Sequence, residues 1–371
     1  MKSSKTILIV AGEASGDLYG AELLLKLKNK FHNLNFVGMG GENMAKLKPH
    51  QFISYKTVSV TGGTEVFKRI HHIFRAFQFI KSLMRSVHID AAVLIDFPDF
   101  NFLLLKHLKR KKIPIIYYVS PQLWAWRKGR IKKIKKYVRE MLVIFPFEAR
   151  WYEQRGAYAT YVGHPLVRLT QSVTYNRTFP KNRIRIGIFP GSRENEIKRL
   201  LPPMIETASE ISKVVAAEFY LFKLSHIDEV YYAPVTQTNL PIKVIVKESI
   251  SQLKDIDFAL ACSGTLTVEL ALLKIPMVIL YKLSPISYYL GKLLMSDIKN
   301  IGMVNLILGE SCFPEFVQHE VKPHHVASHV LEYLRSESKY NEALKKLDSF
   351  RAKLSPTTHV IPVEEVVEKY V

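Results

Sequence analysis

The chain has 371 residues, of which 48% are hydrophobic, and its formal net charge is +20. This length is typical of two globular domains, and two cysteines, Cys262 and Cys312, exclude the small disulfide-rich secreted classes. The positive charge predicts an anionic partner and leaves three classes open: nucleic acid, a phosphorylated substrate and an anionic membrane surface.

Targeting and metal-binding patterns do not occur in the sequence. No segment is long and apolar enough to span a bilayer, and the N-terminus runs into a predicted strand without an apolar leader, so we expect a cytoplasmic protein. No pattern of a known nucleic-acid module is found. No Cys and His residues have the spacing of metal ligands, so we predict no metal site and no cofactor.

The first element in chain order is a short buried strand over residues 6–11, followed by Gly12-Glu13-Ala14-Ser15-Gly16-Asp17 and a helix with an apolar stripe. Glycines in a strand-to-helix turn let backbone amides approach a ligand closely. The spacing does not match the G-x-G-x-x-G dinucleotide fingerprint. A second glycine group, 38–41, closes the next strand and is explained more simply by turns.

Residues 64–85 have the pattern of an amphipathic helix with many basic side chains. One interpretation is a helix that lies on an anionic lipid surface, and the other is a domain helix that packs its stripe on a sheet. Packing on a sheet explains the apolar half of this helix, whereas contact with an anionic lipid surface better explains its excess of positive charge. The residues expected to contact a membrane are Val66, Phe67, Lys68, Arg69, Ile70, Phe74 and Arg75.

Two carboxylates, Asp96 and Asp99, follow the point where a predicted strand over residues 91–96 ends. Ligands of open α/β sheets gather at such carboxyl ends, so either side chain is a candidate general base for a hydroxyl group. The alternative is that Asp99 only caps a helix that begins near Phe100.

The next predicted strand, 114–120, leads into Pro121-Gln122-Leu123-Trp124-Ala125-Trp126-Arg127 and a basic run to Arg139. The two tryptophans fit either an acyl-facing or membrane-facing surface or packing against a neighbouring helix. After two further strands, the polar residues 168–182 are typical of a linker. Strands and helices alternate on both sides of it, which predicts an α/β fold with two Rossmann-like, doubly wound domains, 1–167 and 183–355.

The second domain begins with a buried strand, the turn Pro190-Gly191-Ser192-Arg193 and a helix from Glu194. That order directs free N–H groups and the positive end of the helix dipole at the loop, and Arg193 adds donors that suit phosphate oxygens. The loop is therefore predicted to hold an anion, although an ordinary strand–turn–helix with a surface arginine has the same pattern.

A later strand, 257–261, ends in Cys262-Ser263-Gly264-Thr265, and Glu269 lies about one turn into the predicted helix that follows. A carboxylate there can accept two hydrogen bonds from a sugar diol, or it can complement the helix dipole. Residues 321–355 and 360–371 are predicted to form amphipathic helices.

Taken together and in order, the motifs between residues 12 and 318 resemble those of the lipid-A-disaccharide synthase family, inverting glycosyltransferases with two Rossmann-like domains that face a cleft (the GT-B fold). The motifs that carry the resemblance are Gly12-Glu13-Ala14-Ser15-Gly16-Asp17, Ile95-Asp96-Phe97-Pro98-Asp99-Phe100-Asn101, Ser120-Pro121-Gln122-Leu123-Trp124-Ala125-Trp126-Arg127, Gly163-His164-Pro165, Pro190-Gly191-Ser192-Arg193-Glu194-Asn195-Glu196-Ile197, Ser263-Gly264-Thr265 with Glu269, Pro276-Met277-Val278, and Pro314-Glu315 with Gln318.

The resemblance implies an enzyme that joins UDP-2,3-diacylglucosamine to 2,3-diacylglucosamine 1-phosphate, forms a β(1→6) disaccharide and releases UDP. It implies Asp99 as the catalytic base, with Asp96 as the second choice, and Arg193 as a stabiliser of the leaving diphosphate. The implied donor-binding residues are Gly191, Ser192, Arg193, Ser263, Gly264, Thr265, Glu269, Asn305 and Gln318. The implied acceptor-side residues are Glu13, Ser15, Gly16 and Asp96.

The same resemblance implies peripheral association with the inner membrane, a C-terminal helix over 356–371 that packs back on the first domain, and pairing of two copies through C-terminal helices. The sequence departs from the family pattern at residues 61–65, where the usual apolar entry to the membrane helix is absent, and at Val304-Asn305, where a Pro-Asn pair is usual.

Three other function classes remain open, of which an inactive, purely membrane-associated interaction protein is the weakest, since it leaves the two phosphate-type loops unexplained. Another GT-B enzyme that uses a UDP-sugar, such as an epimerase, has the same fold and the same phosphate-binding logic. A basic nucleic-acid-binding protein is supported only by the charge, and binding of RNA or DNA that depends steeply on salt, without UDP binding, would favour it.

Overall fold

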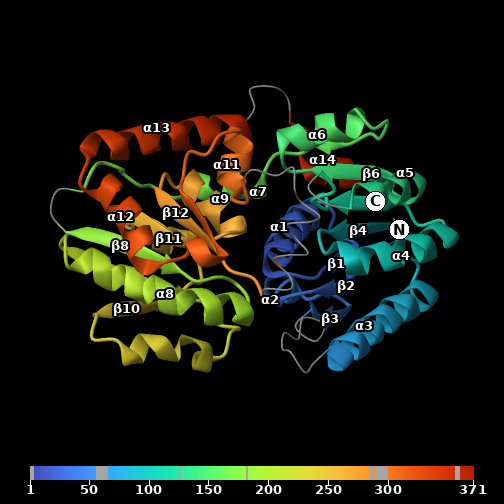
Figure 1. Cartoon of the computed structure of the whole chain (residues 1–371). Coiled ribbons are helices and arrows are strands. Elements are labelled where there is room, and N and C mark those ends of the chain that lie inside the picture. The colour runs from blue at the N-terminus through green and yellow to red at the C-terminus, as the bar shows by residue number, and fades with distance from the viewer. Residues whose placement is uncertain are drawn as a thin grey trace. The chain divides into compact units, whose positions relative to one another are not determined.

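The computed structural model describes residues 4–55, 66–124, 127–180, 183–284, 288, 300–355 and 360–371, with side chains in the helix that starts at Val66 described from His72 onward. Its internal contacts divide the chain into two compact units, which are drawn together in Figure 1. Unit 1 consists of Met1–Pro165 and Pro356–Val371, and unit 2 consists of Leu166–Ser355.

Unit 1 contains a seven-stranded parallel sheet with strand order β3-β2-β1-β4-β5-β6-β7. Its strands are short apolar runs because both faces of a parallel sheet are covered, and the central strand β4 is buried at every position. The strands are β1 (Lys5–Ala11), β2 (Leu34–Gly40), β3 (Gln51–Ser54), β4 (Ala91–Ile95), β5 (Ile115–Tyr118), β6 (Glu140–Val143) and β7 (Thr160–Tyr161).

Helices cover both faces of this sheet (Figure 1). They are α1 (Ala14–Lys30), α2 (Glu42–Ala45), α3 (Val66–Ser86), α4 (Pro98–Arg110), the 3-10 helix η2 (Lys128–Arg130), α5 (Ile131–Tyr137), α6 (Pro146–Glu153) and α14 (Val363–Glu368). The C-terminal helix α14 packs on α1, where Lys26 pairs with Glu364 at 2.9 Å. Tyr370 also donates a hydrogen bond to Glu140 at the start of β6, so the end of the chain is part of unit 1.

Unit 2 contains a six-stranded parallel sheet with strand order β10-β9-β8-β11-β12-β13. The chain thus starts at the centre of each sheet, builds outward to one edge, and then returns to build the other half. The strands are β8 (Ile184–Phe189), β9 (Ala217–Lys223), β10 (Ile242–Val246), β11 (Phe258–Cys262), β12 (Met277–Tyr281) and β13 (Glu315–Val317).

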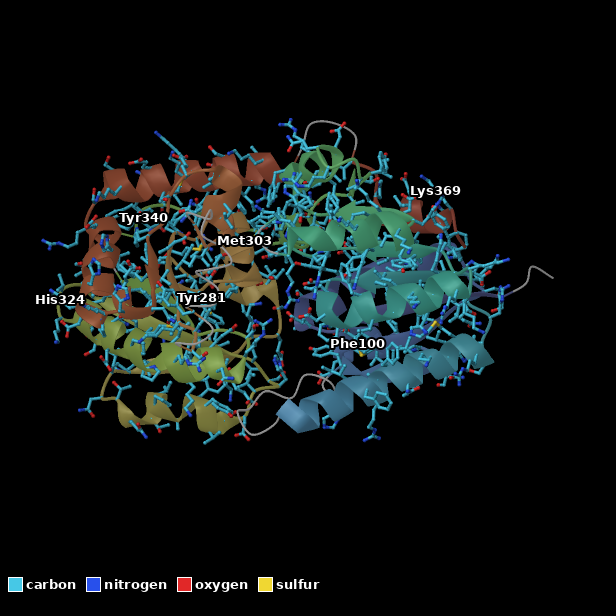
Figure 2. The ribbon with its side chains drawn as sticks, turned by 45° about the vertical axis from the view of Figure 1, so that its right-hand side comes forward. Phe100, Tyr281, Met303, His324, Tyr340 and Lys369 are labelled. Carbon is cyan, nitrogen blue, oxygen red and sulfur yellow. The ribbon has the colours of Figure 1, made fainter. Side chains whose placement is uncertain are left out.

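In the described part of unit 2, the helices that follow β8 are α8 (Glu194–Ser212), η3 (Glu229–Gln237), η4 (Ile250–Leu253), α9 (Thr265–Leu272), α11 (Met303–Leu308), η5 (Gln318–Glu320), α12 (Pro323–Leu334) and α13 (Glu337–Leu354). Helices α8 and α12 pack together over buried residues of the sheet. Tyr281 and Met303, both labelled in Figure 2, mark the end of β12 and the start of α11.

The predicted α/β class with two doubly wound sheets is confirmed by these strand orders. The segment expected to be a linker, 168–182, begins inside a helix, α7 (Pro165–Gln171). Pro165, at the start of α7, suits the first turn of a helix. Leu166 and Val167 are buried, so their apolar contacts stabilise the helix despite the polar composition of the residues that follow.

Candidate active site

The residues predicted for the base, the acceptor side and the diphosphate follow strands that meet at a change of direction in each sheet. This change lies between β1 and β4 in unit 1 and between β8 and β11 in unit 2. In open α/β sheets, ligands bind at the carboxyl ends of the strands beside such a point. The topology therefore brings the loop after β1 next to the loop after β4, and the loop after β8 next to the loop after β11.

In unit 1, these two loops are in direct contact. A Cβ atom on Gly12 would lie 2.2 Å from the ring of Phe97, so only glycine fits while Phe97 keeps its place. Asp96 and Phe97 both have left-handed backbones, with φ of 43° and 45°. Such conformations cost roughly 1–3 kcal/mol each. They are held by hydrogen bonds to the Asp96 carbonyl from Asn101 Nδ2 at 2.6 Å and from the Tyr117 hydroxyl at 2.7 Å.

Asp99 lies in the first turn of α4 with 65% of its side chain exposed. The N-cap position of α4 is occupied by Phe97, so Asp99 does not cap the helix in the way the alternative interpretation required. Asp99 Oδ1 accepts hydrogen bonds from Arg127 Nη1 at 2.5 Å and from Arg130 Nη2 at 2.6 Å. Arg130 is also stacked over the ring of Phe102, at 5.0 Å from its centroid.

The two arginines decide the protonation of Asp99. Partial burial raises its pKa, but the hydrogen bond from Arg130 and the charges of Arg127 and Arg130 outweigh that effect and hold the pKa below its ordinary value. Asp99 is therefore an ionised carboxylate in this state. It is also a weaker base than an unpaired aspartate, because a lower pKa means a lower affinity for the proton.

The other predicted acceptor-side residues lie at the start of α1. Glu13 is the N-cap residue, and Ser15 is half-buried in the first turn. Gly16 is buried, and a Cβ atom there would lie 3.3 Å from Cβ of Ala11. Gly16 therefore lets α1 pack closely on β1, which is a packing role rather than a contact with a ligand.

Asp17, in the same motif, has a structural role that the sequence did not reveal. It is 2% exposed, and its carboxylate accepts hydrogen bonds from the N–H groups of Gly41 at 2.7 Å, Asn43 at 2.9 Å and Met44 at 3.1 Å. These groups belong to the start of α2, whose free donors Asp17 satisfies. The glycine group after β2 is thereby joined to α1.

In unit 2, the predicted phosphate-binding loop after β8 already has an anionic partner in Glu196. Glu196 Oε2 accepts hydrogen bonds from the backbone N–H groups of Ser192 at 2.8 Å and of Arg193 at 3.2 Å. Its Oε1 accepts from Arg193 Nη1 at 3.2 Å. Gly191 has a φ of 129°, and a Cβ atom there would lie 2.6 Å from the Glu196 side chain. In this structure, the backbone donors of the loop and the Arg193 guanidinium are thus bound to a carboxylate of the same unit.

The loop after β11 is open. Gly264 and Thr265 are exposed at the start of α9, and Ser263 is half-buried. The Ser263 hydroxyl donates a hydrogen bond to the carbonyl of Ile301 at 3.4 Å. Glu269 lies farther along α9 and is only 7% exposed. It forms an ion pair with Lys247, which directly follows β10, with 2.9 Å between Oε1 and Nζ.

Asn305 and Gln318, both predicted to line the donor site, hold backbone segments in place. Asn305 is fully buried, and its Nδ2 donates to the Phe313 carbonyl and to Glu315 Oε1, each at 2.7 Å. Its Oδ1 accepts from the Phe313 N–H at 3.0 Å. Gln318 pairs with the backbone of Leu283, accepting from its N–H at 3.0 Å and donating to its carbonyl at 3.3 Å. The direct contact predicted for Asn305 is not seen, because burial leaves it no exposed surface.

The predicted membrane-contact residues are only partly described. The side chains of Val66, Phe67, Lys68, Arg69 and Ile70 lie outside the described part of the chain, as do residues 61–65 and Trp126. On the same helix, Phe74 is 55% exposed and Arg75 is exposed. Farther along α3, Ala76, Ile80 and Leu83 are fully buried, so this half of the apolar stripe packs on the sheet.

None of the helices in the described part of the chain is long and apolar enough to cross a membrane. Within the same residues, no group of three or more His, Cys, Asp or Glu side chains could hold a metal ion.

Sequence reasoning missed Arg130, Glu196 and Glu315. Glu196 had a readable signal, since a glutamate three residues after the N-cap residue is typical of a capping box. Arg130 belongs to a run of basic residues in which nothing distinguishes it, and only the fold brings it to Asp99. Glu315 accepts from the N–H groups of Ile301 at 2.7 Å and Gly302 at 3.0 Å, contacts between segments that are separate in sequence.

Comparisons with known proteins were made on the sequence and on the fold. A family model described as "Lipid-A-disaccharide synthetase" matches residues 7–362. A protein of Trichlorobacter lovleyi named "Lipid-A-disaccharide synthase" is 37% identical, with 92% of this chain and 91% of that protein covered.

Among solved structures, a UDP-GlcNAc 2-epimerase from Neisseria meningitidis bound to UDP-GlcNAc has a TM-score of 0.64 at 10% identity, with 98% of each chain covered. A structure described as the glycotransferase of kitacinnamycin has a TM-score of 0.60 at 13% identity, with 99% of each chain covered. At these identities the likeness is one of fold, and it is to GT-B glycosyltransferases and epimerases.

Proposed function

The chain belongs to the lipid-A-disaccharide synthase family, and from this premise we propose how its residues carry out the reaction. It is a glycosyltransferase of lipid A biosynthesis that joins UDP-2,3-diacylglucosamine to 2,3-diacylglucosamine 1-phosphate and releases UDP. The family match over residues 7–362 carries this function, because the fold is shared with enzymes of other activity.

We assign the base of the reaction to Asp99. Inversion at the sugar carbon needs one displacement, in which a base takes the proton of the acceptor 6-hydroxyl while UDP leaves from the opposite face. An ionised carboxylate at the carboxyl end of β4 suits this role. Asp96 is the second choice. Its backbone is strained in a turn, and its carbonyl accepts two of the hydrogen bonds that hold that turn.

The pairing of Asp99 with Arg127 and Arg130 suggests how the base is activated. The acceptor carries a 1-phosphate, and a pair of arginines is a better partner for a phosphate dianion than for a single carboxylate. When the arginines turn to the phosphate, Asp99 loses the interactions that lower its pKa, and its affinity for the hydroxyl proton rises. Glu13 and Ser15 at the start of α1 are proposed to complete the acceptor side.

On the donor side, we propose that the leaving diphosphate is stabilised by Arg193 and the N–H groups of the loop after β8, assisted by Ser263, Gly264 and Thr265. Because Glu196 holds the N–H groups of Ser192 and Arg193, the diphosphate has to displace its carboxylate from them. Gly191 provides the close approach of the backbone that this requires.

Three further donor-side assignments follow from the contacts. Glu269 would bind the ribose hydroxyls by exchanging part of its contact with Lys247 for them. Asn305 acts through Glu315, which holds residues 301–302 at the start of α11. Gln318 acts through its pairing with the backbone of Leu283. Asn305 and Gln318 are therefore positioning residues in this proposal.

Both substrates are acylated, so we also propose that the enzyme works as a peripheral protein on the inner leaflet of the inner membrane. The exposed Phe74 and the basic residues of α3 and of the segment after Trp124 support this contact. Pairing of two copies through the C-terminal helices remains a proposal that rests on the family resemblance alone.

The test is UDP release from UDP-2,3-diacylglucosamine with 2,3-diacylglucosamine 1-phosphate in the presence of EDTA. We expect turnover by the wild type and a loss on the order of 10²-fold or more in Asp99→Asn, because general-base catalysis contributes about that much. Asp255→Asn, an exposed aspartate of unit 2, is the control and should retain the wild-type rate.

Full activity in Asp99→Asn would indicate that Asp96 is the base, and the proposed reaction would still hold. Equal turnover of donor and acceptor sugars that carry no acyl chains would instead favour another UDP-sugar enzyme of the same fold. Absence of wild-type turnover on the acylated pair would contradict the proposed substrates.

A further inference from the structure

Unit 2 has a pocket of about 550 Å³, and of its lining residues the assignments above use only the pairing of Gln318 with Leu283. It is lined by Arg199, Lys282, Leu283, Tyr288, Gln318, His319 and Val321, and we call it the Arg199 pocket. Its volume is in the range of pockets that hold small ligands. The lining combines cationic side chains with apolar ones, and none of the lining residues is acidic.

The pocket lies where two neighbouring strands end. Strands β12 and β13 are paired in parallel up to Tyr281 and Val317. The lining residues Lys282 and Leu283 directly follow the first position, and Gln318 and His319 directly follow the second. Gln318 has a left-handed backbone with a φ of 55°, and its side-chain amide makes two hydrogen bonds to the backbone of Leu283. These contacts continue the pairing of the two strands beyond the sheet and hold the pocket's edge in one geometry.

Its two permanent cations are available to a ligand. Within the described part of the chain, neither Arg199 nor Lys282 has an ion pair or a side-chain hydrogen bond. Both side chains are half-buried, so their charges act in a partly desolvated space where an anion is held more strongly than at an open surface. Leu283 and the buried Val321 supply an apolar wall beside them.

The pocket is connected to the phosphate-binding loop after β8 through α8 and β12. Arg199 is six residues beyond Arg193, which corresponds to a rise of roughly 9 Å along a helix. Tyr281 directly precedes Lys282, and its pKa is raised by burial and then by the charge of Glu196, with Arg193 acting in the opposite direction. Glu196 and Arg193 are therefore near Tyr281 at the end of β12, one residue before Lys282 of the Arg199 pocket.

We propose that the Arg199 pocket binds the diphosphate of the nucleotide-sugar donor, with Arg199 and Lys282 as its cationic ligands. This inference rests on the proposed function for the identity of the donor. It adds two cations, unpaired within the described residues, to the donors of the loop after β8, which become available to the diphosphate only when it displaces Glu196. The apolar wall of Leu283, Tyr288 and Val321 suits the acylated sugar that is attached to the diphosphate.

UDP is the probe, because it carries the diphosphate without the sugar and its binding needs no turnover. We expect Arg199→Gln and Lys282→Gln each to raise the Kd for UDP about tenfold or more, since a hydrogen bond to a charged group contributes about that factor. Lys198→Gln is the matched control. It removes one charge from the neighbouring, exposed position of α8 outside the pocket, and the Kd should change less than about twofold because solvent screens exposed charges.

The two substrates are then separated kinetically. The proposal requires a higher KM for the donor and an unchanged KM for the acceptor in Arg199→Gln and Lys282→Gln. An unchanged Kd for UDP in both variants, or a rise in the KM of the acceptor alone, would overturn it. If the variants lose UDP binding but the wild type shows no turnover, the Arg199 pocket is still the UDP site. That pair of results would contradict only the proposed substrates.

A measurement on the wild type covers the case in which a variant does not fold. Amine acylation is quantified at Lys282 and Lys198 by peptide mass spectrometry, with and without UDP. Bound diphosphate should shield Lys282 and leave Lys198 as reactive as before. Equal reactivity of Lys282 in both conditions at saturating UDP would also overturn the proposal.

Discussion

The pairing of Asp99 with Arg127 and Arg130 is the residue-scale feature with the greatest consequence for catalysis. A base that is held by two arginines is fully ionised but binds a proton weakly, so the free enzyme carries its base in an inactive form. Asp99 is 65% exposed, which gives the acceptor access to it and to both guanidinium groups. The charge of the substrate can thus change the strength of the base.

The first prediction concerns Arg130→Gln. The variant removes the hydrogen bond and a charge that lower the Asp99 pKa, so this pKa should rise. Because the base works only when deprotonated, the acidic limb of the kcat/KM profile should move to higher pH. The control Lys132→Gln, an exposed position of α5, should leave that limb at its wild-type pH. An unmoved limb in Arg130→Gln would mean that another group is the base.

Asn305 is an example of a residue whose type suggested one role and whose burial indicates another. Asparagine is common in ligand sites, and the family resemblance placed it there. In the structure, the Asn305 amide makes three hydrogen bonds inside the protein, two with the backbone of Phe313 and one with the Glu315 carboxylate. Removing a buried amide leaves its partners unsatisfied at about 1–3 kcal/mol each, so its first effect is on stability.

At the scale of elements, the contact between the turn after β1 and the turn after β4 shapes the acceptor side. Gly12 leaves room for the ring of Phe97, which also stacks with Phe100 at 5.5 Å between centroids. Phe100, labelled in Figure 2, is 2% exposed and fixes α4 to the core. The direction of α4, and with it the position of Asp99, therefore depends on Gly12, which precedes the first residue of the helix, Pro98, by 86 positions.

The second prediction concerns Gly12→Ala. A methyl group 2.2 Å from the Phe97 ring forces the ring or the turn to move. We expect a loss of about 1–3 kcal/mol in the free energy of unfolding, measured in urea, and a fall in kcat as Asp99 is displaced. Gly129→Ala is the control, since nothing lies within 4 Å of its added Cβ atom, and its unfolding energy should stay within about 0.5 kcal/mol. Wild-type stability and kcat in Gly12→Ala would contradict the close contact.

At the scale of the whole molecule, the net charge of +20 and the exposed part of α3 support the same proposal, contact with an anionic membrane. Figure 1 shows α3 beside α4 in unit 1, and the two helices are in contact. Phe74 on α3 and Leu103 on α4 are 55% and 49% exposed. Large apolar side chains beside basic ones are typical of interfacial helices.

The third prediction concerns Phe74→Ser. Binding of the wild type to vesicles with anionic lipid should weaken as salt increases, because salt screens the charges. Phe74→Ser should weaken binding about tenfold at constant salt, since burying a phenylalanine contributes about 1.5–3 kcal/mol. Leu25→Ser, at an apolar position on α1 with a similar exposure of 50%, serves as the control and should bind like the wild type. Equal loss in both variants would indicate non-specific adsorption.

Much of the fold could be predicted because its signals are local. A run such as Ala91–Ile95 is short, apolar and bounded by polar residues, which is sufficient to predict a buried strand. The phosphate-type loop after β8 was predicted for the same reason, from a strand, a glycine turn and a helix start that are contiguous. The helix at Pro165–Gln171 was missed because its stability comes from burial, which composition does not report.

The sequence by itself thus determined the α/β class, the two doubly wound sheets and, through ordered motifs, the family. Those properties depend on periodicity and spacing within short segments. Only the tertiary structure decided which charges meet: Asp99 with Arg127 and Arg130, Glu269 with Lys247, and Arg199 beside Lys282 in one pocket. Each of these groups joins residues from different elements, and the strength of a charge interaction depends on distance and burial, which exist only once the chain has folded.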